Sequence, residues 1–566
     1  MRLINTSTGA FEEFIGRAIP KYAILSHTWE EEEVSYQDYL GCACLHKKGY
    51  RKIRKTLELA KENGVLYAWV DTCCIDKSSS AELTEAINSM YQWYERSERC
   101  LVYLSDLEEG ADVGTQLSQC RWFSRGWTLQ ELIAPGCWNT IFFDEKWSRV
   151  GSKWDLRFQL SLITRIDADV LSHVKPLSSI CVAHKMSWAA NRETTRIEDM
   201  AYCLLGLFDV NMPLLYGEES KAFRRLQEEI IRTNPDLTIF AWQDEPLLTE
   251  QPHTPANLSC HCGILARTPF PFRSAGSLLD VQSRSINREF SVCNLGVKTQ
   301  SIVFRDKTTK GHGTYILPLW CLTKSGCYIG IRLRKIGTNS FVRESPFRFY
   351  EYKDTPSRFA YISKDNYILI DKPTSSPLQV WPHFLPTMDS WTNLNSTSHR
   401  QEFLSIDLAA VAKVYTRWGC FDQEDEVFFV AEGAQTDCAG MSFSIEMPEN
   451  DLGLDTTDTY RCVLYAIGWS KSYHTIFTVL DAQLWRKDVH IIQQEFGQGS
   501  NTPDRWRAIF NHRKIPRVSS IVLPTSDPDH KILICLRYLP ALRKICVSHQ
   551  IKRTEHIAHE VPEWGW

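Results

Sequence analysis

The sequence lacks several features that would place it in a large class of proteins. Its 566 residues contain no run of eighteen apolar residues, and the start, Met1 to Asn5, shows no apolar signal segment. The 19 cysteines are odd in number and irregularly spaced, which argues against a disulfide framework or a paired CxxC zinc site. We therefore expect a soluble, cytoplasmic protein with reduced thiols and no membrane span.

Charge and nucleotide-binding motifs argue against further classes. Lys and Arg total 64 against 68 Asp and Glu, and this balance is atypical of a chain whose main partner is nucleic acid. The sequence has no GxxxxGK[ST] loop and no GxGxxG after a strand, so neither a P-loop ATPase nor a dinucleotide-type oxidoreductase is expected. Adjacent ligands in Cys260-His261-Cys262 leave little room for tetrahedral zinc, so we expect no metal site.

Three apolar runs in the first 105 residues each end in a small polar cluster. Runs of four to six apolar residues without alternation predict strands that are buried on both faces, as in a parallel sheet. Helical periodicity fills the intervals, and Ser79 and Glu82 have capping-box spacing before the second helix. The runs with their clusters are Tyr22–Leu25 with Ser26-His27-Thr28-Trp29, Val65–Val70 with Asp71-Thr72-Cys73-Cys74, and Cys100–Leu104 with Ser105-Asp106.

The three polar clusters are expected to meet at one edge of this sheet. Ligands of open α/β sheets bind outside the carboxyl ends of the strands, near the point where the strand order reverses. Ser26 and His27 could contact a phosphate or ribose there, although His27 could equally hydrogen-bond the neighbouring loop. Asp71 could hold a ribose hydroxyl or cap the turn that follows it.

In the rest of the chain the predicted secondary structure changes twice. A fourth strand is predicted at Thr140–Phe143, after a helix at Trp122–Leu132, and residues 156–240 show helical periodicity interrupted by Pro213 and Gly217. After residue 240, short strand-like runs predict antiparallel β-structure, packed as a sandwich. Residues 461–480 weakly repeat the pattern of residues 313–334, which suggests two related β-units. The predicted runs include Tyr315–Trp320, Tyr328–Ile331, Val427–Val430 and His474–Val479.

The N-terminal half resembles the HET (heterokaryon incompatibility) domain family of filamentous fungi. The resemblance covers roughly residues 1–240 and implies an effector of cell death in fungal self/non-self recognition, acting with other proteins of that pathway. Together with the patterns above it predicts an α/β domain at residues 1–155, a helical extension at 156–240 and a β-rich region at 241–566. Three blocks carry it: Tyr22-Ala23-Ile24-Leu25-Ser26-His27-Thr28-Trp29, Ala68-Trp69-Val70-Asp71-Thr72-Cys73-Cys74-Ile75-Asp76-Lys77 and Arg125-Gly126-Trp127-Thr128-Leu129-Gln130-Glu131.

The HET domain in turn is similar to TIR domains, which have a flavodoxin-like parallel sheet. There a helix after the third strand carries a Trp and, four residues later, a Glu, and Trp127 and Glu131 have this spacing. In enzymatic TIR members that Glu removes nicotinamide from NAD, so the resemblance implies Glu131 as catalytic residue and NAD as substrate, with no cofactor. The ligand-contact candidates are Ser26, His27, Trp29, Asp71, Ser105 and Trp127.

The residues themselves leave alternatives open. Glu131 could be a helix-surface carboxylate or an ion-pair partner of Arg125 or Arg121, and Trp127 could be a core residue rather than a stacking platform. Two functions follow. The domain is either an NAD nucleosidase, whose carboxylate stabilises positive charge on the ribose, or a non-enzymatic module that signals by self-association. In both, the β-rich region would act as sensor or regulator.

Overall fold

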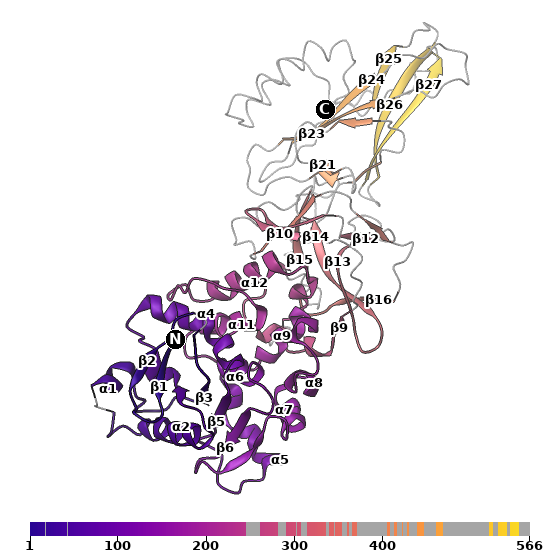
Figure 1. The fold of residues 1–566 in the computed structure, drawn as a ribbon. Helices are drawn as coiled ribbons and strands as arrows, with labels where there is room; N and C mark the ends of the chain where they lie inside the picture. Colours follow the sequence, from indigo (N-terminus) through magenta and orange to yellow (C-terminus); the bar gives the residue numbers. More distant parts are fainter. Residues whose placement is uncertain are drawn as a thin grey trace, which may run out of the picture. The chain divides into compact units, whose positions relative to one another are not determined.

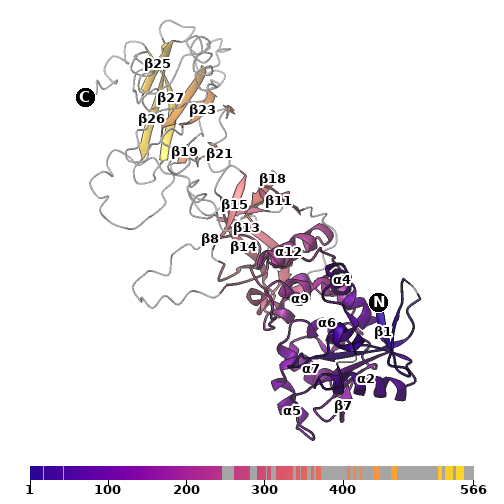
Figure 2. The ribbon, with the colours of Figure 1, turned by 90° about the vertical axis from the view of Figure 1, so that its left-hand side faces the viewer.

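The computed structural model describes the chain as two compact units (Figures 1 and 2). The first comprises Met1–Ile302, Ile316–Arg332 and Glu344–Thr355, and the second comprises Val303–Tyr315, Leu333–Arg343 and Pro356–Trp566. The structure describes residues 1–244 except 17, 42 and 43. It also describes residues 261–370 except 281–289, 301–302, 307–313, 336–338, 345, 354–358 and 362–364. Beyond residue 370 it describes a set of strands. The predicted strand His474–Val479 and the residue Cys260 lie outside these described residues.

The N-terminal domain is built on a mixed sheet with the strand order β2-β1-β4-β3-β5-β6-β7. Its four inner strands β4, β3, β5 and β6 are mutually parallel, which confirms the predicted parallel strands. The antiparallel strands β1, β2 and β7 at its two sides were not predicted. The bounds are β1 Arg2–Asn5, β2 Phe11–Glu13, β3 Tyr22–His27, β4 Tyr67–Trp69, β5 Arg99–Tyr103, β6 Thr140–Phe143 and β7 Arg149–Ser152.

Helices cover both faces of this sheet. α2 (Tyr50–Glu62) packs on Ala23 and Ala68, whereas α4 (Ser80–Glu95) lies on the other face, where the Tyr94 hydroxyl donates to the Leu25 carbonyl at 3.0 Å. Ser79 caps α4 by accepting a hydrogen bond from the Glu82 N–H, whereas the Glu82 side chain accepts from the Asp76 N–H, so only half of the predicted capping box forms. The short helices nearby are α1 Tyr36–Leu40, α3 Asp71–Cys74, α5 Val113–Gln116 and α6 Thr128–Ile133.

The prediction of one helix over Trp122–Leu132 is wrong in detail. The structure has a 3-10 turn at Arg121–Ser124 and then the separate helix α6. The break is held by backbone hydrogen bonds to Glu193, whose carbonyl accepts from the Gly126 N–H at 2.8 Å and whose N–H donates to Ser124 at 2.7 Å. A Cβ at Gly126 would meet the Thr194 side chain at 2.5 Å, so only glycine allows this close approach.

The segment after the sheet is helical, as predicted, and packs on the N-terminal domain. The Asn88 side chain of α4 bonds both the carbonyl and the N–H of Met212, each at 3.1 Å. A Cβ at Gly206 would lie 2.0 Å from the Tyr91 Cβ, so α11 and α4 approach as closely as glycine permits. The helices are α7 Arg157–Thr164, α8 Ala168–Leu171, α9 Val182–Ala189, α10 Asp199–Tyr202, α11 Leu205–Phe208 and α12 Lys221–Thr233.

Most described residues after 260 belong to β-strands, which confirms the predicted change from helices to β-structure. The predicted strands at 315–320 and 328–331 lie within β13 and β14, and the one at 427–430 overlaps β22; their packing as a sandwich stays a prediction. The strands are β8 His261–Cys262, β9 Leu279–Asp280, β10 Phe290–Cys293, β11 Gly296–Gln300, β12 Phe304–Asp306, β13 Thr314–Leu322, β14 Tyr328–Lys335, β15 Ser340–Glu344, β16 Tyr350–Tyr352, β17 Phe359–Tyr361, β18 Asp365–Ile368, β19 Ser405–Asp407, β20 Lys413–Tyr415, β21 Phe421–Asp422, β22 Val427–Phe428, β23 Cys438–Ile445, β24 Tyr460–Ile467, β25 Ser520–Pro524, β26 His530–Leu539 and β27 Lys544–Arg553.

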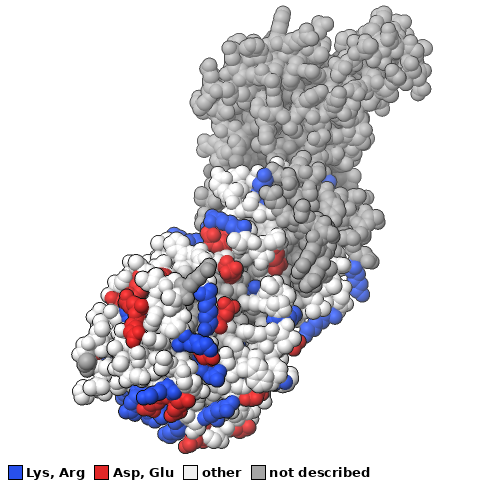
Figure 3. All heavy atoms as spheres, in the orientation of Figure 1, with Lys and Arg blue, Asp and Glu red and all other residues white. Residues whose placement is uncertain are grey.

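Surface charge is mixed on the face shown in Figure 3, where acidic and basic side chains lie interspersed. The basic run on α2 is ion-paired: Lys52 binds Glu33 and Glu30, and Lys55 binds Glu58. Among the described helices, none has both the length and the apolar character needed to cross a membrane.

Candidate functional site

The three polar clusters lie at one edge of the sheet, as predicted. Because β3 pairs in parallel with both β4 and β5, residues at their carboxyl ends share that edge. The strand order reverses at β3, with β4 on one side and β5 on the other. Successive side chains of a strand point to opposite faces, however, so Ser26 and His27 belong to two different groups.

Glu131 and Ser26 form the centre of the first group, on the face covered by α4 and α6. The Ser26 hydroxyl donates to Glu131 Oε2 at 2.5 Å and accepts from the Trp122 Nε1–H at 2.9 Å. Ser26 is 0% exposed and Glu131 6% exposed. The Tyr94 hydroxyl, which donates its proton to the Leu25 carbonyl, also lies beside Glu131. The carboxyl group therefore lies in a closed network of neutral side chains.

This environment sets the protonation of Glu131. Burial raises the pKa of its carboxyl group to about 8, and the charge of Asp71 acts in the same direction. The hydrogen bond from Ser26, the neighbouring Tyr94 hydroxyl and the charge of Arg192 act in the opposite direction without cancelling the effect of burial. Glu131 is thus mostly protonated at neutral pH, a perturbation common at functional sites.

The sequence left two other roles open for Glu131, a helix-surface carboxylate and an ion-pair partner of Arg125 or Arg121. The structure supports neither of them. Its side chain is buried rather than on a helix surface. Arg121 pairs with Glu30 at 3.3 Å and with Asp106 at 3.5 Å, and Arg125 donates to the Thr195 hydroxyl at 3.0 Å. Neither predicted arginine neutralises Glu131, and the nearby cation is Arg192, from the helical extension.

His27 belongs to the second group, on the α2 face. Its Nε2 lies 3.8 Å from Glu33 Oε1 and its Nδ1 lies 3.9 Å from Asp71 Oδ1, both longer than a hydrogen bond. Lys52 Nζ is 2.5 Å from Glu33 Oε1. Burial alone would raise the pKa of Glu33, but His27 and Lys52 together lower it to about 2. This loop carboxylate is therefore ionised and holds residues 28–33 against α2.

Trp29 and Asp71 stand at the exposed rim of this group. The Trp29 Nε1–H donates to Asp71 Oδ2 at 2.8 Å, and Lys77 Nζ lies 3.6 Å from the centre of the indole. Trp29 is 52% exposed, so part of its ring faces solvent. Ser105 follows β5 and lies beside Glu30, and its hydroxyl has no hydrogen-bond partner among the described residues. Trp127, by contrast, lies beside Asp199 of the helical extension.

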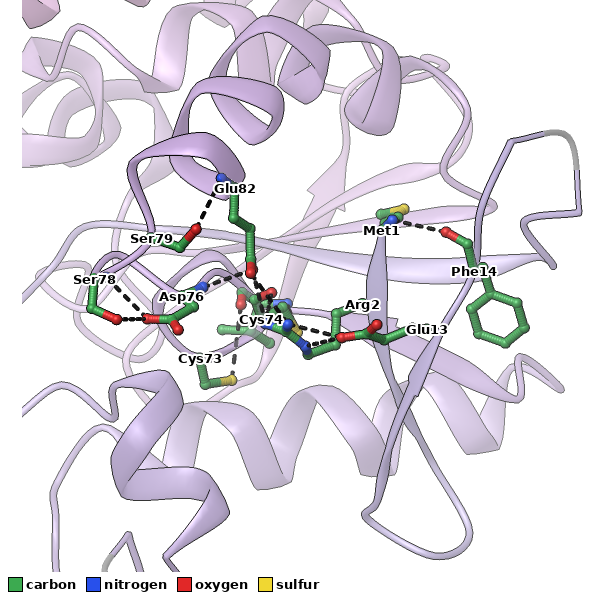
Figure 4. A network of polar contacts seen from close by, with 11 residues as sticks. Met1, Arg2, Glu13, Phe14, Cys73, Cys74, Asp76, Ser78, Ser79 and Glu82 are labelled. Carbon is green, nitrogen blue, oxygen red and sulfur yellow. Dashed lines mark hydrogen bonds and ion pairs between the residues drawn. The ribbon is translucent and has the colours of Figure 1, made fainter.

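The position of Asp71 is fixed through α3, the helix that it begins. Figure 4 shows the network that holds the other end of α3, at Cys74. Arg2 Nη1 donates to the Cys74 carbonyl at 3.3 Å and to Glu82 at 2.8 Å, while Arg2 Nη2 binds Glu13 at 2.9 Å. Glu82 also accepts from the Asp76 N–H at 2.8 Å. Strand β1 and helix α4 are thereby tied to the turn that presents Asp71.

Two buried basic side chains hold the helix that carries Glu131. Lys153 Nζ donates to the carbonyls of Leu132 at 2.8 Å and of Pro135 at 2.5 Å, at the carboxyl end of α6. Arg192 Nη1 donates to the Arg125 carbonyl at 2.8 Å and to the Thr128 hydroxyl at 2.9 Å, at its start. α6 is thus clamped at both ends.

Sequence patterns did not identify Trp122, Tyr94, Arg192, Lys52 or Glu33 as parts of these groups. Trp122 and Tyr94 are indistinguishable from core aromatics, and Arg192 lies sixty residues beyond the motif it supports. Residues 30–33 are all Glu and α2 is rich in Lys and Arg, so the sequence does indicate ion pairs between these two segments. The ligand contacts of Ser26, His27, Trp29, Asp71, Ser105 and Trp127, and catalysis by Glu131, stay predictions.

Comparison with known proteins indicates the family of this domain. Residues 22–120, from β3 to the turn before Trp122, match the family model described as heterokaryon incompatibility protein (HET). The chain contains a HET domain. The matched residues include Ser26, His27, Asp71 and Ser105 but end before the Arg125–Glu131 block.

One curated relative supports the same assignment. Vegetative incompatibility protein HET-E-1 of Podospora anserina is 48% identical over 222 residues, which make up 38% of this chain and 16% of that protein. The chain therefore spans only a small part of the length of this relative. Residues 221–301 match a second family model, described as a domain of unknown function (DUF8212), which runs across the boundary predicted at residue 240. No solved structure matches the chain.

Proposed function

We propose that this chain is an effector of heterokaryon incompatibility that triggers cell death, and that its HET domain does so by removing nicotinamide from NAD at Glu131. The observation that carries the proposal is the buried Glu131–Ser26 pair at the edge where the strand order reverses. The incompatibility role is supported by the HET domain and by the similarity to a vegetative incompatibility protein.

The chemistry of NAD cleavage fits a single buried carboxylate. Breaking the bond between nicotinamide and ribose develops positive charge on the sugar, which an adjacent carboxylate stabilises more in the transition state than in the ground state. Nicotinamide leaves as a neutral group while water bonds to the ribose carbon in its place and releases a proton, so no metal or cofactor is required. The cationic nicotinamide ring of bound NAD would also favour ionisation of Glu131, because an opposite charge lowers the pKa of a carboxyl group.

The fold supports the same site. The parallel strands follow the order β4-β3-β5-β6. This order supports the proposal, because the TIR resemblance implies a flavodoxin-like sheet in which the second strand lies outside the first, followed by the third and fourth. In sheets of this order the ligand lies between the first and third strands, here β3 and β5. Trp29, Asp71, His27 and Ser105 surround that position from the α2 side and would contact the ribose, phosphates or base of the dinucleotide. Ser26 would act through Glu131, since its hydroxyl is fully engaged.

A second function is favoured by a different observation. Trp138 and Trp154 stack at 4.6 Å, Arg157 lies over both Trp154 and Phe158, and this aromatic cluster reaches the surface. Trp138, Phe158 and Leu162 are 60%, 59% and 84% exposed. Exposed apolar clusters of this kind commonly mark protein interfaces. Self-association of the chain through this cluster would signal without chemistry, with the β-rich region as sensor or regulator.

Nicotinamide release distinguishes the two functions. Purified full-length chain is incubated with NAD, either dispersed or clustered on a multivalent scaffold, and free nicotinamide is quantified by chromatography. We expect release that rises on clustering, because Glu131 is closed off in the isolated chain. Cell death without nicotinamide release, lost when Phe158 and Leu162 are changed to Ser, would instead establish the assembly function.

A further inference from the structure

Arg192 connects the helical extension to the Glu131 group. It is 5% exposed, and a buried guanidinium is rare without a partner. Its Nη1 donates to the Arg125 carbonyl and to the Thr128 hydroxyl, at the first turn of α6. The Thr128 hydroxyl lies against the Trp122 carbonyl, and the Trp122 indole continues through Ser26 to Glu131.

Hydrogen bonds through other residues connect Arg192 to Glu131, and the two side chains do not contact each other. Arg192 and Glu131 are linked through Thr128, Trp122 and Ser26 rather than by a direct ion pair. In an interior of low dielectric constant a charge still acts over such a separation. The other titratable groups that act on Glu131 are Asp71 of α3, Tyr94 of α4 and Cys100 of β5. Arg192 is the cation among them.

We propose that Arg192 is a positioning residue for Glu131: its hydrogen bonds orient the start of α6, and its charge favours the ionised carboxylate that cleavage of the N-glycosidic bond needs. The inference rests on the proposed function for its catalytic meaning. It also makes the helical extension part of the catalytic unit, because the residue that prepares Glu131 lies beyond the residues matched by the HET model. Asp71 opposes this effect, since its negative charge disfavours a second one nearby.

Three variants of the full chain separate charge from hydrogen bonding. Arg192→Gln keeps a donor for the Arg125 carbonyl but removes the charge. Arg192→Lys keeps the charge, and Thr128→Val removes the hydroxyl that Arg192 contacts while leaving the charge in place. A purely structural role predicts that all three alter the melting temperature and that none alters the titration of Glu131.

The test is the infrared titration of the Glu131 carboxyl group. Its C=O stretching band is assigned by its absence in Glu131→Gln and followed from pH 5 to pH 10. We expect the midpoint to rise by about one pH unit in Arg192→Gln, to stay near that of the wild type in Arg192→Lys, and to be unchanged in Thr128→Val. A midpoint unchanged in Arg192→Gln would overturn the inference. If Arg192→Gln does not fold, a raised midpoint in Arg192→Lys or in Thr128→Val would overturn it, because both variants keep the charge.

Activity is read separately, so that the two proposals fail in distinguishable ways. At pH 7 nicotinamide release by clustered Arg192→Gln should fall about tenfold and recover at pH 9, since one pH unit changes the ionised fraction of a mostly protonated acid about tenfold. Absence of release from every variant, with the midpoint shifted in Arg192→Gln, would reject NAD cleavage and leave the role of Arg192 in place. Release that falls equally at pH 7 and pH 9 would contradict the charge effect.

Discussion

Replacing Glu131 by Gln should reduce nicotinamide release by a factor on the order of 10² or more, because among the described residues no other carboxylate lies within the Ser26 network to stabilise charge on the ribose. The amide has nearly the same shape and can still accept a hydrogen bond from the Ser26 hydroxyl. The fold should therefore survive. The measurement is the initial rate of clustered full-length protein at pH 8, with circular dichroism as the check on folding.

A matched control tests whether any Glu-to-Gln change has this effect. Glu85 lies on α4 and is exposed to solvent. Glu85→Gln should release nicotinamide at the rate of the wild type. Equal rates for wild type and Glu131→Gln would remove Glu131 from the mechanism, and cell death that persists in Glu131→Gln would favour signalling by assembly.

The stability of the wild type should fall as pH rises from about 4.5 to about 8, and Glu131→Gln should lose this dependence. Burial raises the folded-state pKa of Glu131 above its unfolded value of 4.5, so in this window the folded chain binds a proton that the unfolded chain has released. The contribution of Glu131 is fully present below pH 4.5 and is lost as pH rises through about 8. At roughly 1.4 kcal/mol per pH unit the change in stability is on the order of 5 kcal/mol.

Other groups change with pH as well, so the difference between the two proteins is the quantity to measure. Burial lowers the pKa of Lys153 to about 7, which makes the folded state more stable as pH rises from 7 to 10.5, the opposite direction. Urea unfolding of wild type and Glu131→Gln at pH 5 and at pH 8.5 isolates Glu131. We expect the variant to gain several kcal/mol relative to the wild type at the higher pH. A constant difference would show that Glu131 is ionised in the folded protein.

The core of the N-terminal sheet could be predicted from the sequence because its strands are continuous apolar runs. Tyr22–Leu25 and Cys100–Leu104 are buried on both faces, and only parallel inner strands require this. Strands β1 and β2 escaped prediction because they are short and pair at the side of the sheet. The helix at Trp122–Leu132 was wrong because its interruption depends on Glu193, a contact that local periodicity does not contain.

The candidate site was predicted in outline and not in detail. The carboxyl ends of the predicted strands indicated the edge of the sheet at which the site lies, because parallel strands bring these ends together. Strand alternation then separates Ser26 from His27, and this follows from the sequence once the strand is known. Arg192 could not be found in this way, because its approach to α6 depends on how the helical extension packs. The burial that raises the pKa of Glu131 likewise depends on Tyr94 and Trp122, which come from different elements.

The pH dependence of nicotinamide release is the most direct test of the claim that Glu131 acts as a carboxylate prepared by its buried surroundings. Clustered wild-type protein is assayed at low NAD concentration from pH 6 to pH 9.5, so that the rate reports kcat/KM for the free enzyme. The account predicts a rise of about tenfold per pH unit that levels off near pH 8, the pKa of Glu131. A rate that is flat across this range, or that has the same profile in Glu131→Gln, would contradict it.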